Sequence, residues 1–153
     1  MALQPMFMTC SAAAGWHHWA MTDIATLGDW LGRYERAWRS NDAAEAAALF
    51  TDDAVYRFRP WDALAAGAVE GRDAIAKAWL DDPDDPAAWS MECEPLAVNG
   101  SLGIARCVTR YATTDHQPGR TYYNIFLVDL ADDGRCRDFV EYFMENPKDP
   151  GLV

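Results

Sequence analysis

The stretch from Arg120 to Glu145 constrains the fold more than any other, because it has the pattern of a long β-hairpin. Two runs rich in aromatic and β-branched residues, Arg120–Leu130 and Arg135–Glu145, flank the turn sequence Ala131-Asp132-Asp133-Gly134. An Asp-Gly pair between two such runs is a strong hairpin signal. We therefore expect two paired antiparallel strands here, covered on one face by the rest of the chain.

Alternation along these two strands predicts a ligand-binding face, because every second side chain of a strand points the same way. The residues that share a face are Phe139, Glu141 and Phe143 on the second strand and Asn124, Phe126 and Val128 on the first. If the two sets face the same way, the sheet presents an apolar surface with one carboxylate, Glu141, and one amide, Asn124. Glu141 is then either an acid or base of an enzyme or the ion-pair partner of a nearby arginine.

The upstream chain has the pattern of three helices and three more strands. Apolar and aromatic residues recur at helical spacing between Asp23 and Arg39, which predicts one amphipathic helix. A capping-box-like start at Asp42 predicts a short second helix that runs to Phe50 and is ended by Thr51-Asp52-Asp53. The other expected elements are a strand at Ala54–Arg59, a loop at Trp61–Glu70, a helix at Arg72–Leu80, and strands at Trp89–Asn99 and Leu102–Thr113.

Several side chains on these elements are candidates for the wall of a pocket. Tyr34 is the only polar group on the inward face of the first helix, so it is either a core aromatic or a hydrogen-bonding group of the site. Arg110 shares parity with Ile104 and Val108, and it becomes a candidate partner for Glu141 if that parity faces inward. The full set of expected pocket residues is Trp38, Phe58, Arg59, Trp61, Trp79, Arg110, Phe126, Phe139 and Phe143.

The composition excludes some classes of partner. The 153 residues, 50% of them hydrophobic, are enough for one domain with its own core. The net charge of −11, from 24 acidic and 13 basic residues, argues against nucleic acids and anionic membranes, since binding them requires a basic face. No apolar run approaches the roughly 18 residues of a membrane span. We expect a cytoplasmic protein.

Three groups of residues resemble metal or disulfide motifs. The four cysteines, Cys10, Cys93, Cys107 and Cys136, contain no Cys-x-x-Cys pair, so we expect reduced thiols rather than a zinc site or disulfides. The segment Asp81–Pro86 is rich in carboxylates but lacks the glycine and the final glutamate of a calcium loop, which favours a solvated connector. His17 and His18 lie with Cys10 in an expected poorly ordered extension, so no metal site is expected there.

The order of these elements resembles that of the nuclear-transport-factor-2-like superfamily, in particular its SnoaL-like branch, from Ile24 to Glu145. The resemblance lies in the segments Arg39–Asp42, Ala48–Val55, Gly71–Ile75, Asp132–Cys136 and Glu141–Phe143. It implies an α+β, cone-shaped fold with about three N-terminal helices on a curved antiparallel sheet around a central pocket. The domain then spans residues 22–146, between an extension at 1–21 and an irregular tail at 147–153, and it forms a homodimer.

The resemblance implies no single function, because the family includes isomerases, cyclases, dehydratases, epoxide hydrolases, scaffolds and binding modules. Compared with ketosteroid isomerase, Tyr34 falls where that enzyme has its oxyanion-stabilising tyrosine. The position of its general base falls on Phe58 or Arg59, and that of its second oxyanion donor falls on Phe126. Since two of the three groups are missing, steroid isomerisation by that mechanism is not expected.

Two readings of the function remain open. In the first, the protein is a cofactor-independent isomerase, cyclase or dehydratase in which Glu141 moves a proton on a small apolar substrate while Tyr34 and Asn124 bind the developing negative charge. In the second, it is a non-catalytic small-molecule-binding or interaction module in which Arg59 or Arg110 neutralises Glu141. A nucleotide-binding role lacks support, since the chain has no glycine-rich phosphate loop.

Overall fold

The computed structural model describes residues 22–62, 67–115 and 117–152. The expected N-terminal extension, with Cys10, His17 and His18, lies outside the described residues. The helices are α1 (Ile24–Ser40), α2 (Ala43–Ala48) and α3 (Arg72–Leu80). The strands are β1 (Phe50–Arg57), β2 (Val69–Glu70), β3 (Trp89–Asn99), β4 (Leu102–Tyr111), β5 (Arg120–Leu130) and β6 (Cys136–Glu145).

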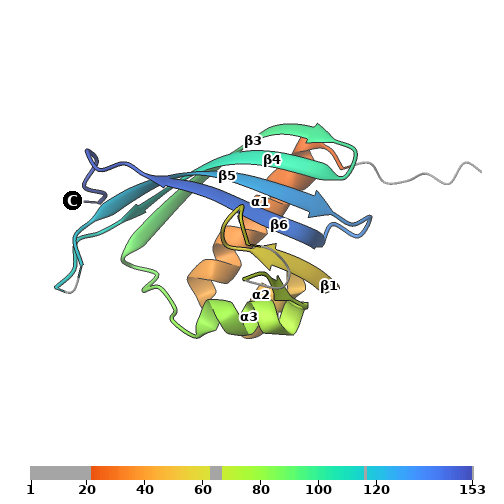
Figure 1. Cartoon of the computed structure of the whole chain (residues 1–153), viewed down its shortest axis with the longest axis horizontal. Helices are drawn as coiled ribbons and strands as arrows, with labels where there is room; N and C mark the ends of the chain where they lie inside the picture. Colours follow the sequence, from red (N-terminus) through yellow and green to blue (C-terminus); the bar gives the residue numbers. More distant parts are fainter. Residues whose placement is uncertain (1–21, 63–66, 116, 153) are drawn as a thin grey trace, which may run out of the picture.

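These strands form one curved sheet in the order β2-β1-β6-β5-β4-β3, and the helices lie on one side of it (Figure 1). All neighbours are antiparallel except β1 and β6, which are parallel, so the sheet is mixed rather than purely antiparallel as expected. Three helices on a curved sheet confirm the predicted α+β, cone-like fold.

The hairpin of β5 and β6 forms where the sequence predicts it, with a register shift between Asp129 and Leu130. Phe126 lies opposite Glu141, and Asn124 lies opposite Phe143. Gly134 closes the turn with a φ of 75°, a backbone conformation that favours glycine. The two sets of alternating side chains therefore do face the same way.

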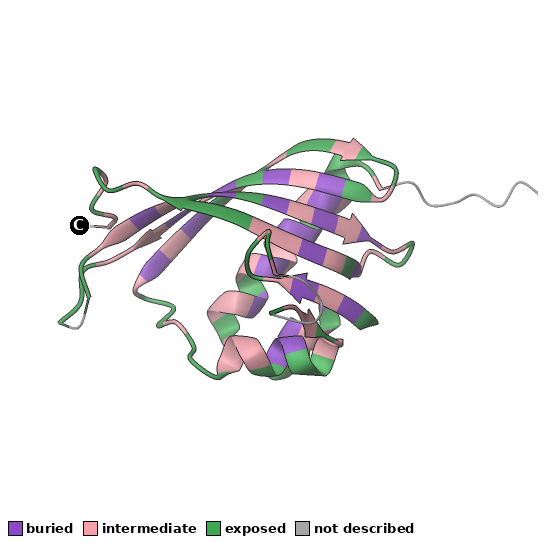
Figure 2. Ribbon diagram, viewed as in Figure 1, coloured by how far each residue is buried: buried purple, intermediate pink, exposed green. Residues whose placement is uncertain are grey.

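The core lies between this sheet and α1, where the buried residues of Figure 2 gather. Asp23 caps α1 by accepting a 2.7 Å hydrogen bond from the Thr26 backbone, and the predicted apolar spacing brings Leu27, Leu31 and Tyr34 onto the buried face. Trp30, fully buried, donates its indole N–H to the Leu49 carbonyl at 3.2 Å. This bond ties α1 to the segment that leads into β1.

The start of β1 was predicted wrongly. The strand begins at Phe50 rather than Ala54, so Thr51, Asp52 and Asp53 belong to it instead of ending a helix. The reason is a long-range contact: Phe50 pairs in parallel with Cys136, whose backbone N–H donates to the Leu49 carbonyl at 2.8 Å. Local turn propensity at Thr51–Asp53 is overridden by this pairing.

The expectation of reduced thiols is wrong for two of the cysteines. Cys93 and Cys107 lie directly opposite each other on β3 and β4 and form a disulfide. The register of Ala97 opposite Ile104 would, if continued, set Cys93 against Val108. A bulge between Pro95 and Ala97 shifts the pairing by one residue and brings the two cysteines together.

Candidate functional site

A cavity of about 430 Å³ opens between the helices and the concave face of the sheet. Its volume lies within the range of about 300–1,000 Å³ that is typical of small-ligand sites. Aromatic rings make up most of its wall, namely Tyr34, Trp38, Tyr56, Phe58, Trp79, Tyr111, Tyr122, Phe126 and Phe143. The remaining lining residues are Ala78, Asp82, Asp84, Thr109, Gln117, Arg120, Asn124 and Glu141.

The three proposed catalytic residues, Glu141, Tyr34 and Asn124, all line this one cavity. They come from β6, α1 and β5 respectively, so the fold gathers them from distant parts of the chain. Five expected pocket residues also line it: Trp38, Phe58, Trp79, Phe126 and Phe143.

The other four expected pocket residues lie elsewhere. Arg110 is on the opposite face of β4, because the buried residues of that strand have the parity of Ala105 and Cys107, and it pairs with Glu92 at 3.2 Å. Arg110 is therefore not the partner of Glu141. Phe139 is fully buried in the core. Arg59 and Trp61 do not line the cavity; the guanidinium carbon of Arg59 lies over the exposed Trp61 ring, 6.0 Å from its centroid.

Glu141 enters the cavity without an ion pair or hydrogen bond to any described residue. It lies on β6 opposite Phe126, among aromatic side chains that solvate a charge poorly. Burial accordingly raises the pKa of Glu141 from 4.5 to about 7. A carboxyl group with this pKa is able both to accept and to return a proton at neutral pH.

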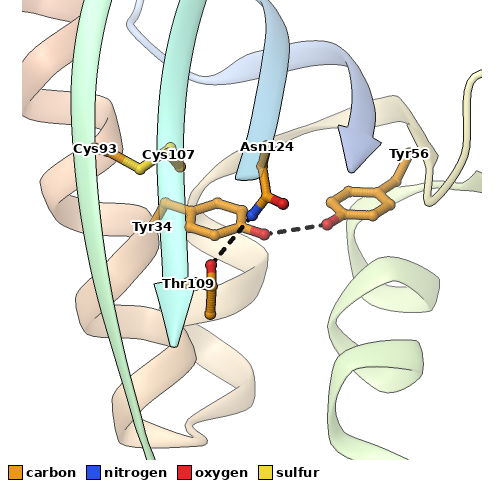
Figure 3. Close-up of a disulfide and its surroundings, with 6 residues drawn as sticks. All are labelled: Tyr34, Tyr56, Cys93, Cys107, Thr109 and Asn124. Carbon is orange, nitrogen blue, oxygen red and sulfur yellow. Dashed lines mark hydrogen bonds between the residues drawn. A yellow bond between two sulfur atoms is a disulfide. The ribbon is translucent and has the colours of Figure 1, made fainter. Parts of the chain in front are cut away.

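A pair of buried phenols faces the same space. The hydroxyls of Tyr34 and Tyr56 lie 3.2 Å apart and share a hydrogen bond (Figure 3). Burial raises the pKa of both tyrosines, and the charge of Glu141 raises it further, so both phenols stay protonated. The Trp79 side chain, whose ring centroid lies 6.0 Å from that of Tyr56, acts on the pKa of Tyr56 in the opposite direction.

The hydrogen bond between the two phenols can run in either direction, because each hydroxyl donates one proton and also accepts at its oxygen. When Tyr56 is the donor, the Tyr34 oxygen accepts and Tyr34 keeps its own proton. That proton is then available to a group inside the cavity. In this arrangement Tyr34 is able to donate to a ligand, and Tyr56 supports it.

Asn124 adds a buried amide to the site. Its Nδ2 donates to the Thr109 hydroxyl at 3.1 Å, as Figure 3 shows, and both side chains are almost fully buried. Its Oδ1 is buried and has no hydrogen-bond partner among the residues that the structure describes. Since a buried polar atom without a partner costs free energy, this oxygen is available to a ligand donor.

The sequence reasoning missed Tyr56, Thr109 and the residues around the cavity mouth. Tyr56 has the same parity as the predicted pocket residue Phe58, so the alternation of β1 could have found it. Thr109 could be found only if the buried face of β4 were known, and the sequence leaves that face open. The mouth residues Asp82 and Asp84 were assigned to a solvated connector, and that connector does lie at the cavity.

Metal and membrane signals are absent from the described part of the chain. No group of three histidine, cysteine or acidic side chains there is arranged to hold a metal ion. No helix within the described ranges has the length and apolar character of a membrane span.

Comparison with known families and structures places this geometry in context. The family described as SnoaL-like domain matches residues 31–139. A search of curated proteins found no match.

Three solved structures illustrate the similarity of fold. RV0760c from Mycobacterium tuberculosis is 12% identical with a TM-score of 0.64, and the match covers 82% of this chain and 99% of that one. SalBIII, an epoxide hydrolase/cyclase-like enzyme of pyran ring formation in salinomycin, is 14% identical with a TM-score of 0.64, covering 86% and 98%. A Δ5-3-ketosteroid isomerase from Mycobacterium sp. is 17% identical with a TM-score of 0.60, covering 79% and 98%.

Proposed function

This chain belongs to the SnoaL-like domain family, and we propose that it is a cofactor-independent enzyme of the isomerase or cyclase type. In this proposal Glu141 moves a proton on a small apolar substrate that carries a carbonyl group. The observation that carries the proposal is a carboxyl group without a partner among the described residues, enclosed with a phenol pair in an aromatic cavity.

The roles follow from the chemistry of the side chains. As a carboxylate, Glu141 takes a proton from the carbon next to the substrate carbonyl, which leaves an enolate. The Tyr34 hydroxyl donates a hydrogen bond to the enolate oxygen and keeps its proton, and the hydrogen bond with Tyr56 holds the phenol in place. Where the substrate also has a carbon–carbon double bond beside that carbon, the enolate is a dienolate. Protonated Glu141 then returns the proton to its far carbon, so the double bond moves and the product is an isomer of the substrate.

The positions that match the catalytic residues of ketosteroid isomerase support a different proton carrier in this cavity. The base position of that enzyme falls on Phe58 or Arg59 and its second oxyanion donor on Phe126; Phe58 and Phe126 are apolar walls of the cavity, and Arg59 does not line it. A carboxylate on β6 is the only acidic side chain on the sheet portion of the described cavity lining. A proton-transfer role therefore falls to Glu141 rather than to either of the matched positions.

The alternative reading required Arg59 or Arg110 to neutralise Glu141. Neither arginine lines the cavity, and Arg110 is paired with Glu92. A binding protein without catalysis remains the outcome to test against the enzyme.

An exchange assay tests the proposal without knowledge of the natural substrate. Small cyclic and arylalkyl ketones are incubated with the protein in D2O, and loss of the α-proton signal is followed by NMR. We expect exchange above the buffer rate for at least one ketone, and a loss of about 100-fold or more in Glu141→Gln.

The matched control is Glu94→Gln, because the carboxylate of Glu94 is exposed on β3 and pairs with Arg106. It should keep the full rate. Ketones that bind without exchange, or exchange that Glu141→Gln leaves unchanged, would overturn the catalytic role and leave a binding protein.

A further inference from the structure

The mouth of the cavity carries negatively charged side chains that have no role in the proposed proton transfer. Two carboxylates of the connector after α3, Asp82 and Asp84, line the cavity there. Neither forms an ion pair with a described residue. Asp84 is partly buried, whereas Asp82 is exposed, so Asp84 is the carboxylate that lies closest to an enclosed environment.

The fold holds Asp84 in this position. Asn41, at the end of α1 with a φ of 51°, donates its side-chain amide to the Asp84 carbonyl at 3.2 Å. Arg39 donates to the carbonyl of Pro86 at 2.8 Å. The backbone of the connector is therefore tied to the C-terminal end of α1 at two points, Asp84 and Pro86.

Among the described residues, no cation contacts this carboxylate. The Tyr111 hydroxyl donates to it over a long distance of 3.4 Å, and the Trp38 side chain beside it lowers the pKa of Asp84. Burial raises the pKa of Asp84 because the charge has lost water without gaining a cation. The rings of Trp38 and Tyr111 also line the cavity, so a cation beside Asp84 would meet aromatic side chains too.

The one cation among the described lining residues is engaged elsewhere. Arg120 donates to the Tyr122 hydroxyl at 3.4 Å, and that hydroxyl donates to Glu145 at 3.5 Å. Glu145 also adds to the raised pKa of Arg120. Its charge is thus partly offset, and Asp84 has no cationic partner among the described residues.

We propose that the mouth of this cavity is a recognition subsite for a protonated amine, with Asp84 as its counter-ion. The natural ligand is then an apolar molecule that carries one basic nitrogen. Anionic ligands are disfavoured, since Asp82, Asp84 and ionised Glu141 would all repel them. The chain's net charge of −11 favours the approach of cations in addition.

This inference rests on the proposed function only in placing the ligand in the same cavity. It requires no catalysis by Glu141, so the two proposals are able to fail separately.

Three probes of matched shape and different charge test the subsite: 4-phenylbutylamine, 4-phenylbutanol and 4-phenylbutyrate. Each is titrated into the full chain and followed by NMR on the Trp38 indole N–H and the Asn124 side-chain amide, at about pH 6. At this pH the amine keeps its proton while Glu141, with its pKa of about 7, is mostly neutral. We expect the amine to bind about tenfold tighter than the alcohol, and the carboxylate to bind most weakly.

Variants assign the preference to a residue. Asp84→Asn should abolish the preference for the amine and leave binding of the alcohol within about twofold. Asp85→Asn, which alters the neighbouring exposed carboxylate outside the cavity, should keep the preference. If Asp84→Asn does not fold, the salt dependence of the wild type decides, because only amine binding should weaken as sodium chloride is added.

Three results would overturn the subsite: the butyrate binds as tightly as the amine, the preference survives Asp84→Asn, or amine binding does not respond to salt. A preference lost in Glu141→Gln but kept in Asp84→Asn would also overturn it, by assigning the cation to Glu141. An amine preference without any ketone exchange would instead support the subsite while removing the proposed catalysis.

Discussion

The carboxyl group of Glu141 should make the stability of this protein depend on pH in a way that Glu141→Gln removes. Its pKa is about 7 in the folded state against 4.5 for the free group. The folded state therefore binds this proton more tightly than the unfolded chain does. The stability that the protonated group contributes is fully present below about pH 4.5 and is lost as the pH rises through about 7.

The magnitude follows from the difference between the two pKa values. Above pH 7 the ionised carboxylate should lower the free energy of unfolding by about 3 kcal/mol relative to a neutral group of the same shape. Glutamine is such a group, so Glu141→Gln should be more stable than the wild type by up to about 3 kcal/mol at pH 8. Near pH 4.5 the two proteins should differ little.

Urea denaturation of both proteins at several pH values between about 4.5 and 8.5 measures this difference. Glu94→Gln is the control: its carboxylate is more than half exposed, so its substitution should change stability by less than about 1 kcal/mol at any pH. The reasoning is refuted if Glu141→Gln is less stable than the wild type at pH 8. A constant difference at all pH values would equally contradict a raised pKa.

Three further predictions concern the phenol pair, the disulfide and the outer face of the sheet. Tyr34→Phe should slow ketone exchange by about 100-fold and Tyr56→Phe by less, since Tyr34 is proposed to contact the enolate oxygen and Tyr56 to support it; NMR exchange rates compare the two variants. Reducing the Cys93–Cys107 disulfide should lower the free energy of unfolding by about 2–3 kcal/mol, measured in urea with and without reductant. We propose that the exposed apolar side chain of Ile125 on β5 lies in a homodimer interface. Light scattering should then give about twice the chain mass of 17.1 kDa for the wild type and 17.1 kDa for Ile125→Asp.

The hairpin shows how much of the site could be predicted from the sequence. Alternation predicted the apolar neighbours that Glu141 and Asn124 each have on their own strand and left open whether the two sets face the same way; the register of β5 and β6 shows that they do. The helical spacing of α1 likewise brought Tyr34 inward. These predictions succeeded because each depends on the local period of a single element or on one short turn.

The failures involve contacts between distant elements. The prediction of Arg110 in the pocket is wrong because apolar and polar residues do not alternate clearly along β4. The sequence of that strand therefore does not indicate which face is buried. The Cys93–Cys107 disulfide depends on a bulge that the turn at Asn99 and Gly100 does not predict. Asp84 reaches the cavity through a hydrogen bond from Asn41, which is 43 positions away in the chain.

The most direct test of the central claim is the pKa of Glu141, obtained from the pH dependence of its side-chain carboxyl 13C signal. Glu141→Gln identifies that signal by its disappearance. We predict a midpoint of about 7, as expected for a buried carboxyl group without an ion-pair partner among the described residues. A midpoint at or below the 4.5 of the free group would mean that a cation or hydrogen-bond donors stabilise the carboxylate, and Glu141 would no longer be the proton carrier.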